Sequence, residues 1–325
     1  MKLFIKGMLC ASLVVSSAFS QDVVKAVAKE PAVVKSTAAD IEIFTSDNAD
    51  GKITPESIEK AFKEAGFVVS ANRDMNGPFV TQFKESSFDT YNLFTFYKQD
   101  TVLELVKKYP NIGLFAPMSM SIYTKKGDTT ISVSSLTAEA MAKIMQAPSD
   151  DRTLHDLRAL VKQTLKKAMP NGSFEVLPYE MQEAKGELVT NVSMEVDSDE
   201  WEDQLDEFKM GLEGELAPNG FVIAGHSNLG DDFEESNYEG FDFYEVYSIC
   251  KLPVIYNIAK TRPEAGAYAP CSLYLSKKKN EDMMQIGFPS VYNWMSSMAI
   301  DNKEDMEVLE TAQTGMKKIL TGLTQ

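Results

Sequence analysis

Hydrophobic residues recur along the chain with two different spacings, one typical of helices and one typical of strands. Between residues 55 and 65 the apolar positions return every three or four residues, as in a helix with one buried face. Thr54 followed by Pro55 is a typical helix start, and Gly66 is a typical helix end. The apolar run at 67–71 then predicts a strand directly after this helix.

The same reasoning assigns elements to the rest of the chain. In the first half it predicts strands at 42–45, 92–97, 118–124 and 130–133, and helices at 102–108, 138–145 and 154–169. In the second half it predicts strands at 187–196, 221–224, 244–250, 271–276 and 284–288, and helices at 200–216, 254–260, 291–299 and 303–323. Apart from the short helix at 102–108 or 254–260, each half has the order β-α-β4-α, which predicts an α+β fold with helices on one face of an antiparallel sheet.

The two halves also share a set of residues that we call the repeat frame. Its first copy comprises Pro110, Gly113, Ala116, Pro117 and Ser119, and its second copy, 153 residues later, comprises Pro263, Gly266, Ala269, Pro270 and Ser272. At the same offset, Tyr91, Lys98 and Lys107 recur as Tyr244, Lys251 and Lys260. A gap-free match inside matching hydrophobic patterns indicates a tandem repeat. We expect one domain at 41–170 and a second at 171–325.

The N-terminal residues 1–20 have the pattern of a secretory signal peptide. A basic start and an apolar run at 8–15 precede the small-residue site Ala18-Phe19-Ser20. This pattern predicts cleavage before Gln21 and export to the periplasm or the medium. Residues 21–40, rich in Ala, Val and Lys, are expected to form a flexible tether.

Composition narrows the possible functions. The chain has 48 acidic and 32 basic residues, which gives a net charge of −16. A chain this acidic lacks the basic surface that nonspecific binding to nucleic acid or to an anionic membrane requires. Beyond the N-terminus no apolar run is long enough to span a membrane. Without a phosphate-binding loop, a dinucleotide fingerprint or a Gly-x-Ser-x-Gly elbow, we expect no cofactor and assign no catalytic residues.

Two cysteines are the main candidates for chemistry. Cys250 and Cys271 are the pair that remains once the signal peptide is removed, and paired cysteines in an exported protein favour a disulfide. A bridge closing a loop of about 20 residues would stabilise the fold by roughly 3 kcal/mol. A redox-active pair, two buried free thiols and metal or haem ligation stay open as alternatives.

Other polar motifs favour structural roles. His155 and His226 are expected at the surface, and the acidic stretch at 195–207 is expected to form a solvated helix face. The segment before Thr54 resembles a calcium-binding loop only in part, because Ser46 and Ser57 stand where such a loop needs Asp and Glu. We therefore expect no metal site.

The repeat frame resembles a known family. Tyr97-Lys98 or Cys250-Lys251, a short helix and then Pro-x-x-Gly-x-x-Ala-Pro-x-Ser before a hairpin are similar to the DUF302 family of domains of unknown function. The resemblance implies a TATA-binding-protein-like fold, here present twice, and implies no activity. Many members carry a cysteine before the short helix and a Pro-Cys pair after it, as in Cys250 and Pro270-Cys271. Tyr97 and Met118 replace these cysteines in the first copy, so any role of the pair is confined to the second.

These observations favour a binding module over an enzyme. The expected partner is a small apolar ligand held between the sheet and the long helix, or a protein bound to a sheet face. Two alternatives stay open: a thiol–disulfide redox protein that uses Cys250 and Cys271, and a structural tandem without a ligand.

Overall fold

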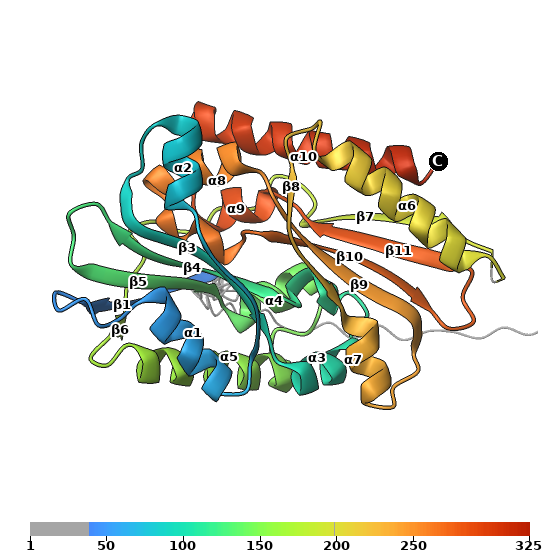
Figure 1. Ribbon diagram of the computed structural model, residues 1–325, viewed down its shortest axis with the longest axis horizontal. Coiled ribbons are helices and arrows are strands. Elements are labelled where there is room, and N and C mark those ends of the chain that lie inside the picture. The colour runs from blue at the N-terminus through green and yellow to red at the C-terminus, as the bar shows by residue number, and fades with distance from the viewer. Residues whose placement is uncertain (1–38, 198) are drawn as a thin grey trace, which may run out of the picture. The chain divides into compact units, whose positions relative to one another are not determined.

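The computed structural model describes residues 39–197 and 199–325 (Figure 1). The predicted signal peptide and all but the last two residues of the predicted tether lie outside these ranges. None of the helices in the described ranges has the length and apolar content that a membrane span requires.

The elements of the two repeats follow the same order. The first repeat contains β1 (Ile41–Asp47), α1 (Pro55–Glu64), β2 (Val68–Asp74), α2 (Asn76–Phe83), β3 (Phe88–Tyr97), α3 (Gln99–Val106), the 3₁₀ helix η1 (Ile112–Phe115), β4 (Met118–Lys125), β5 (Thr130–Leu136), α4 (Ala138–Met145) and α5 (Arg152–Ala168). After the short strand β6 (Ser173–Phe174), the second repeat contains β7 (Val189–Glu195), α6 (Trp201–Leu216), β8 (Val222–Asn228), α7 (Leu229–Glu235), β9 (Phe241–Cys250), α8 (Leu252–Thr261), the 3₁₀ helix η2 (Pro263–Ala267), β10 (Cys271–Lys278), β11 (Met283–Pro289), α9 (Tyr292–Ser297) and α10 (Lys303–Leu323).

Each repeat builds its own antiparallel sheet. The first sheet has the order β2-β3-β4-β5-β1-β6, and the second, read in the same sense, has the order β8-β9-β10-β11-β7. Equivalent strands therefore occupy equivalent places, and β6 is an addition at the far edge of the first sheet. The prediction of two antiparallel α+β units is confirmed.

The central strands β3 and β9 present different residues on their two faces. On one face of β3, the rings of Phe94 and Phe96 lie 5.4 and 4.8 Å from the ring of Phe62 in α1. On the corresponding face of β9, Phe243 stacks on Trp201 of α6 at 5.4 Å. Because side chains alternate along a strand, the residues between them point away from these helices. Those opposite faces hold the contacts between the repeats.

Two short helices, α2 and α7, were not predicted. Each contains one aromatic residue that anchors it to the central strand beside it. Phe79 lies 5.7 Å from Tyr91, and Phe233 lies 5.6 Å from Tyr244, measured between ring centroids. The matching contacts show that α2 and α7 are equivalent parts of the two repeats.

The predicted start of α1 is confirmed. The Thr54 hydroxyl accepts a hydrogen bond from the Ser57 backbone nitrogen, and the Ser57 hydroxyl accepts one from the Thr54 nitrogen. This capping box satisfies donors that a helix N-terminus otherwise leaves open. The turn before it is closed by Asn48, whose Oδ1 accepts from the backbone nitrogen of Ile53 at 2.8 Å.

Candidate ligand-binding site between the two repeats

The repeat frame lies where each repeat contacts the other. The Tyr244 hydroxyl donates to the backbone oxygen of Pro110 at 2.7 Å, and the equivalent Tyr91 hydroxyl donates to that of Pro263 at 3.0 Å. The two bonds run in opposite directions between equivalent residues, so they are related by a pseudo-twofold operation. The frame therefore joins the repeats to each other, rather than bracing a turn within each one.

The frame serines form a second reciprocal pair. The Ser119 hydroxyl donates to the oxygen of Pro270 at 2.9 Å, and the Ser272 hydroxyl donates to the oxygen of Pro117 at 3.0 Å. Pro117 and Pro270 both follow cis peptide bonds. All four residues belong to the repeat frame, which explains why they recur together.

The frame glycines allow the two backbones to approach closely. A Cβ atom on Gly113 would lie 2.5 Å from the Cβ of Tyr274, and one on Gly266 would lie 2.9 Å from the Cα of Ser121. Real side chains avoid both separations. Glycine is needed here because there is no room for a side chain.

A cavity of about 580 Å³ lies between the two repeats, in the range typical of small-molecule sites. Its walls come from β2, α2 and β3 of the first repeat and from β8, β9 and the start of α8 in the second. The lining is mostly apolar and contains no Asp or Glu: Ala71, Arg73, Met75, Pro78, Gln82, Leu93, Thr95, Ala217, Gly220, Phe221, Val222, Ile223, Ala224, Ser248, Cys250, Lys251, Leu252, Pro253 and Pro270.

The cavity is open because Cys250 stands at the position that Tyr97 occupies in the first repeat. At the pseudo-equivalent place, the Tyr97 hydroxyl donates to Asp232 Oδ2 of α7 at 2.8 Å, and Gln99 Nε2 donates to Asp232 Oδ1 at 3.2 Å. At the cavity, Cys250 occupies the position of Tyr97, and Pro78 occupies that of Asp232. Cysteine lacks the phenol ring that crosses the gap on the other side. The exchange of tyrosine for cysteine therefore leaves space between the repeats on one side.

The two cysteines are free thiols, so the predicted disulfide is not formed. Cys271 pairs with Ile249 across β9 and β10, and Cys250 is the next residue along β9. Neighbouring residues in a strand point to opposite faces of a sheet, so the two thiols leave the sheet on opposite sides. The register of β9 and β10 therefore decides the direction of each thiol.

The environment of both thiols disfavours redox chemistry. Burial raises the pKa of Cys250 to about 12. Burial also raises the pKa of Cys271 to about 12, with a smaller Coulombic contribution from Cys250. Thiol exchange requires a thiolate, and these groups hold their protons at neutral pH. Cys250 lines the cavity as a small apolar group, whereas the Cys271 thiol donates to the Tyr268 backbone oxygen at 3.2 Å.

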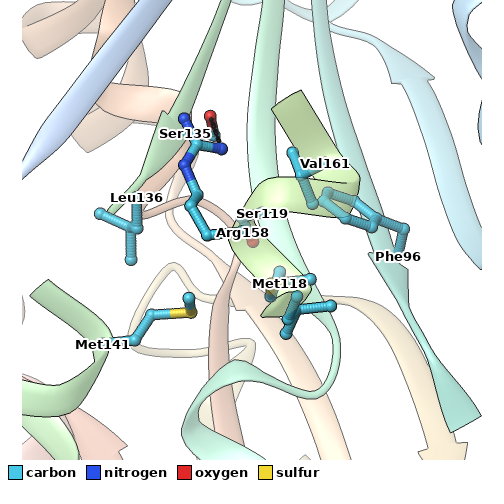
Figure 2. Close-up of a pocket in the computed structure, with 9 residues that line it drawn as sticks. Phe96, Met118, Ser119, Ser135, Leu136, Met141, Arg158 and Val161 are labelled. Atoms are coloured by element: carbon cyan, nitrogen blue, oxygen red, sulfur yellow. Dashed lines mark hydrogen bonds between the residues drawn. The ribbon is translucent and has the colours of Figure 1, made fainter. Parts of the chain in front are cut away.

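The location predicted for a ligand, between the sheet and the long helix, is filled in the first repeat. Figure 2 shows this space, where Arg158 of α5 reaches Ser135 of β5 among apolar side chains. The space there is about 10 Å³, room for about one water molecule. A mostly apolar cavity of ligand size lies between the repeats instead.

A second hollow of about 420 Å³ beside α5 differs in its chemistry. Within it, Glu42 pairs with both Arg158 and Lys162, the latter at 2.7 Å. Its main charges neutralise one another, so it offers a ligand less than the cavity between the repeats does.

Neither histidine lines the cavity between the repeats. His155 Nε2 lies 2.8 Å from the Ser149 oxygen, and His226 Nε2 lies 2.8 Å from Glu245 Oε2. Within residues 39–197 and 199–325 no group of three or more His, Cys, Asp or Glu side chains is arranged to hold a metal ion.

The fold and the shared frame define a tandem pair of antiparallel α+β domains. Residues 44–171 and 194–323 each match the model of the family described as "Domain of unknown function DUF302". The chain therefore belongs to the DUF302 family and carries two copies of its domain.

One solved structure of the same family is similar to part of the chain. It is the crystal structure of the uncharacterized conserved protein DUF302 from Bacillus stearothermophilus, at 16% sequence identity and a TM-score of 0.32. The match covers 43% of this chain and 97% of that chain. No functionally curated protein matches the chain.

Proposed function

We propose that the protein is a binding module that holds a small, largely apolar molecule in the cavity between its two repeats. The observation that carries this proposal is the apolar cavity of about 580 Å³, which residues of both repeats line. Its size and lining are those of a site that buries most of a ligand's surface.

The edge strand β8 supports the proposal. Val222 and Ile223 line the cavity and are 53% and 39% exposed, which is high for large apolar side chains. Covering apolar surface stabilises a complex by roughly 25 cal/mol per Å². A bound apolar molecule would remove this surface from water.

A purely structural tandem explains the cavity less well. On the equivalent side, Tyr97 and Asp232 close the same gap with a hydrogen bond of 2.8 Å. The same fold can therefore fill this gap with packed side chains. A gap left unfilled costs stability in proportion to its volume. Departures from good packing are expected at functional sites.

The proposal is tested by filling the cavity from its edge. Val222→Trp places a large ring at the β8 wall, and Val68→Trp is the matched control, because Val68 pairs with Tyr97 as Val222 pairs with Cys250. Val68 is 40% exposed and does not line the cavity. Binding of the neutral fluorescent probe N-phenyl-1-naphthylamine should be lost in the first variant and kept in the second. Equal binding by both variants, or no binding by the unmodified protein, contradicts the proposal.

A second variant closes the cavity with the residues that close its counterpart. Cys250→Tyr combined with Pro78→Asp recreates the Tyr97–Asp232 pair on the other side. We expect this double variant to lose the probe while its resistance to urea stays equal or rises, since it replaces a cavity with a hydrogen-bonded ring.

We further propose that the protein acts outside the cytoplasm. Support comes from the residues Ala18-Phe19-Ser20, which follow a basic start and an apolar run. N-terminal sequencing of the protein from separated cell fractions should find Gln21 as the first residue, outside the inner membrane. A cytoplasmic protein that begins at Met1 would refute export.

The likeness of each repeat to the TATA-binding protein stays part of the proposal. It is supported by the five equivalent antiparallel strands in each repeat, with helices on one face. Superposition of an experimental structure of this chain on that protein would test it.

A further inference from the structure

We infer that the ligand is an anionic amphiphile, an apolar chain with a carboxylate that Arg73 and Lys251 bind. This inference rests on the proposed binding function and specifies the class of ligand. It is argued from the charges at the cavity, which differ from those of the chain as a whole.

The cavity concentrates positive charge in an acidic protein. The chain has 48 acidic and 32 basic residues, yet the lining contains two basic residues and no acidic one. Low-dielectric walls strengthen the field of such charges. The cavity therefore favours an anion, against the net charge of the protein.

Arg73 is available to a ligand. It lies in β2 at the exposed rim, and its side chain makes no hydrogen bond or ion pair with any described residue. The adjacent carboxylate of Asp74 is engaged elsewhere, since its oxygens accept from the backbone nitrogens of Asn76 and Gly77, both at 3.1 Å. A guanidinium without a partner suits a carboxylate, because it can donate two parallel hydrogen bonds.

Among the described residues Lys251 also lacks an acidic partner, unlike Lys98, the equivalent residue of the first repeat. Lys98 Nζ pairs with Asp100 at 3.0 Å, whereas the position equivalent to Asp100 in the second repeat is Pro253. Lys251 Nζ instead donates to the backbone oxygen of Asn219 at 2.9 Å. The second repeat thus keeps the lysine and lacks the carboxylate that would neutralise it.

The surroundings of Lys251 make an anion favourable there. Its Nζ lies 4.6 Å from the centre of the Phe221 ring, which also lines the cavity. Burial lowers the pKa of this ammonium, because part of its hydration is lost. A carboxylate beside it would compensate that loss, while the apolar chain of the ligand would contact the β8 wall.

The inference is tested with ligands that differ only in the head group. Binding of dodecanoate, dodecan-1-ol and dodecylammonium, each below its micelle concentration, is measured by titration calorimetry. We expect dodecanoate to bind most tightly, at least about tenfold more tightly than the alcohol, as a hydrogen bond to a charged group predicts. We expect dodecylammonium to bind most weakly.

Matched lysine variants assign the effect to the cavity. Arg73→Gln and Lys251→Gln should each weaken dodecanoate binding by at least about tenfold more than dodecan-1-ol binding, and circular dichroism checks that both variants are folded. Lys98→Gln removes the same charge from the equivalent position and should have no effect.

The possible failures are distinguishable. If the alcohol and dodecanoate bind equally, or if Lys251→Gln behaves as Lys98→Gln does, the carboxylate inference is wrong and the apolar binding site stands. If no ligand binds and Val222→Trp leaves probe fluorescence unchanged, the proposed function itself is wrong.

Discussion

In the first repeat β3 ends in Tyr97, whose hydroxyl reaches Asp232 of the other repeat, whereas in the second repeat β9 ends in Cys250, which faces a cavity. The other inward residues of the two strands correspond closely: Tyr91 with Tyr244, Leu93 with Val246 and Thr95 with Ser248. Within these strands Tyr97 and Cys250 are the non-conservative exchange, and together with the exchange of Asp232 for Pro78 it separates a packed contact from an open site. The comparison teaches that the repeats retain a shared interface while one side of it diverges.

A second difference lies on the helix-facing side of the sheets. Three side chains link the first helix, the edge strand and the central strand in each repeat. In the first repeat they are Glu59, Asn72 and Asn92, joined by hydrogen bonds of 2.9 Å. In the second repeat they are Lys209, His226 and Glu245, joined at 3.0 and 2.8 Å. The connection differs: Asn72 of the edge strand is the middle member in the first repeat, whereas Glu245 of the central strand is the middle member in the second and pairs with the charged Lys209.

The largest effect should come from making the first repeat resemble the second. Tyr97→Cys removes the ring that closes the gap and the hydrogen bond to Asp232, so it should lower the free energy of unfolding by about 2–4 kcal/mol. Urea unfolding measures this loss, and Tyr97→Phe, which removes only the hydroxyl, should lose less. Equal stability of Tyr97→Cys and the unmodified protein would show that the packed side does not close the gap as described.

The frame glycines should be the next most sensitive positions. Gly113→Ala and Gly266→Ala each force a methyl group against the other repeat, and overpacking of this kind costs about 1–3 kcal/mol. Gly214→Ala in α6 is the control, because an added Cβ there meets nothing within 4 Å. Urea unfolding should show the control to be at least as stable as the parent, since alanine favours a helix. If either frame variant matches the control, the close approach is not required at that glycine.

The two frame tyrosines should differ from each other despite their equivalence. The Tyr244 hydroxyl donates to Pro110 and also accepts from the Gly113 nitrogen at 2.8 Å. The Pro263 oxygen, by contrast, accepts from both Tyr91 and Ser121, the latter at 2.9 Å. Removal of the Tyr244 hydroxyl therefore leaves the buried Gly113 nitrogen without its partner and also breaks the bond to the oxygen of Pro110, an exposed residue. Removal of the Tyr91 hydroxyl leaves the Pro263 oxygen still bonded to Ser121.

An unsatisfied buried group costs about 1–3 kcal/mol, so Tyr244→Phe, which orphans the Gly113 nitrogen, should destabilise by about 2 kcal/mol and Tyr91→Phe by about 1 kcal/mol. Chemical denaturation of both variants under the same conditions gives the comparison. Equal losses would mean that Ser121 does not support Pro263 as described.

The smallest expected effect concerns acid stability. Burial raises the pKa of Glu245, but hydrogen bonds from His226 and Lys209 outweigh it, so the pKa lies below its usual value. A carboxyl with a lowered pKa stabilises the fold above its unfolded pKa of about 4.3, and this contribution is lost as the pH falls through the folded value. Unfolding measured from pH 7 to pH 3 should therefore depend less on pH in Glu245→Gln.

The expected difference at neutral pH is about 1 kcal/mol, the scale of a partly exposed ion pair. Glu234→Gln is the control, because it removes the same charge from an exposed position. Identical pH profiles for the two variants would exclude a role for the Glu245 network in acid stability.

Much of the fold was predictable because it depends on local patterns. The Thr54 cap and the alternation along β3 and β9 are properties of short stretches of chain. The helices α2 and α7 escaped prediction because each depends on one aromatic residue, Phe79 or Phe233, packed on a distant strand. Segments of seven or eight residues have little helical preference of their own.

The candidate site was predictable only in part. Cys250 was singled out as one half of a disulfide, and it proved to be part of a cavity wall. Two differences between the repeats could have indicated the site: Cys250 stands where the first repeat has Tyr97, and Pro253 stands where it has Asp100. Their meaning was not visible, because nothing in a linear alignment shows that Pro78 and Cys250 face one gap from different repeats.

Residue patterns along the chain are enough to specify the two copies, the family, the order of the main elements and the residues of the repeat frame. Only the tertiary structure decided that the frame of each repeat bonds to the other, through pairs such as Tyr91 and Pro263 that are 172 residues apart. It also decided that the two thiols diverge and that the site opens between the repeats. The physical reason is that periodicity along a strand specifies which residues share a face, whereas the packing of two faces depends on side-chain volumes from both.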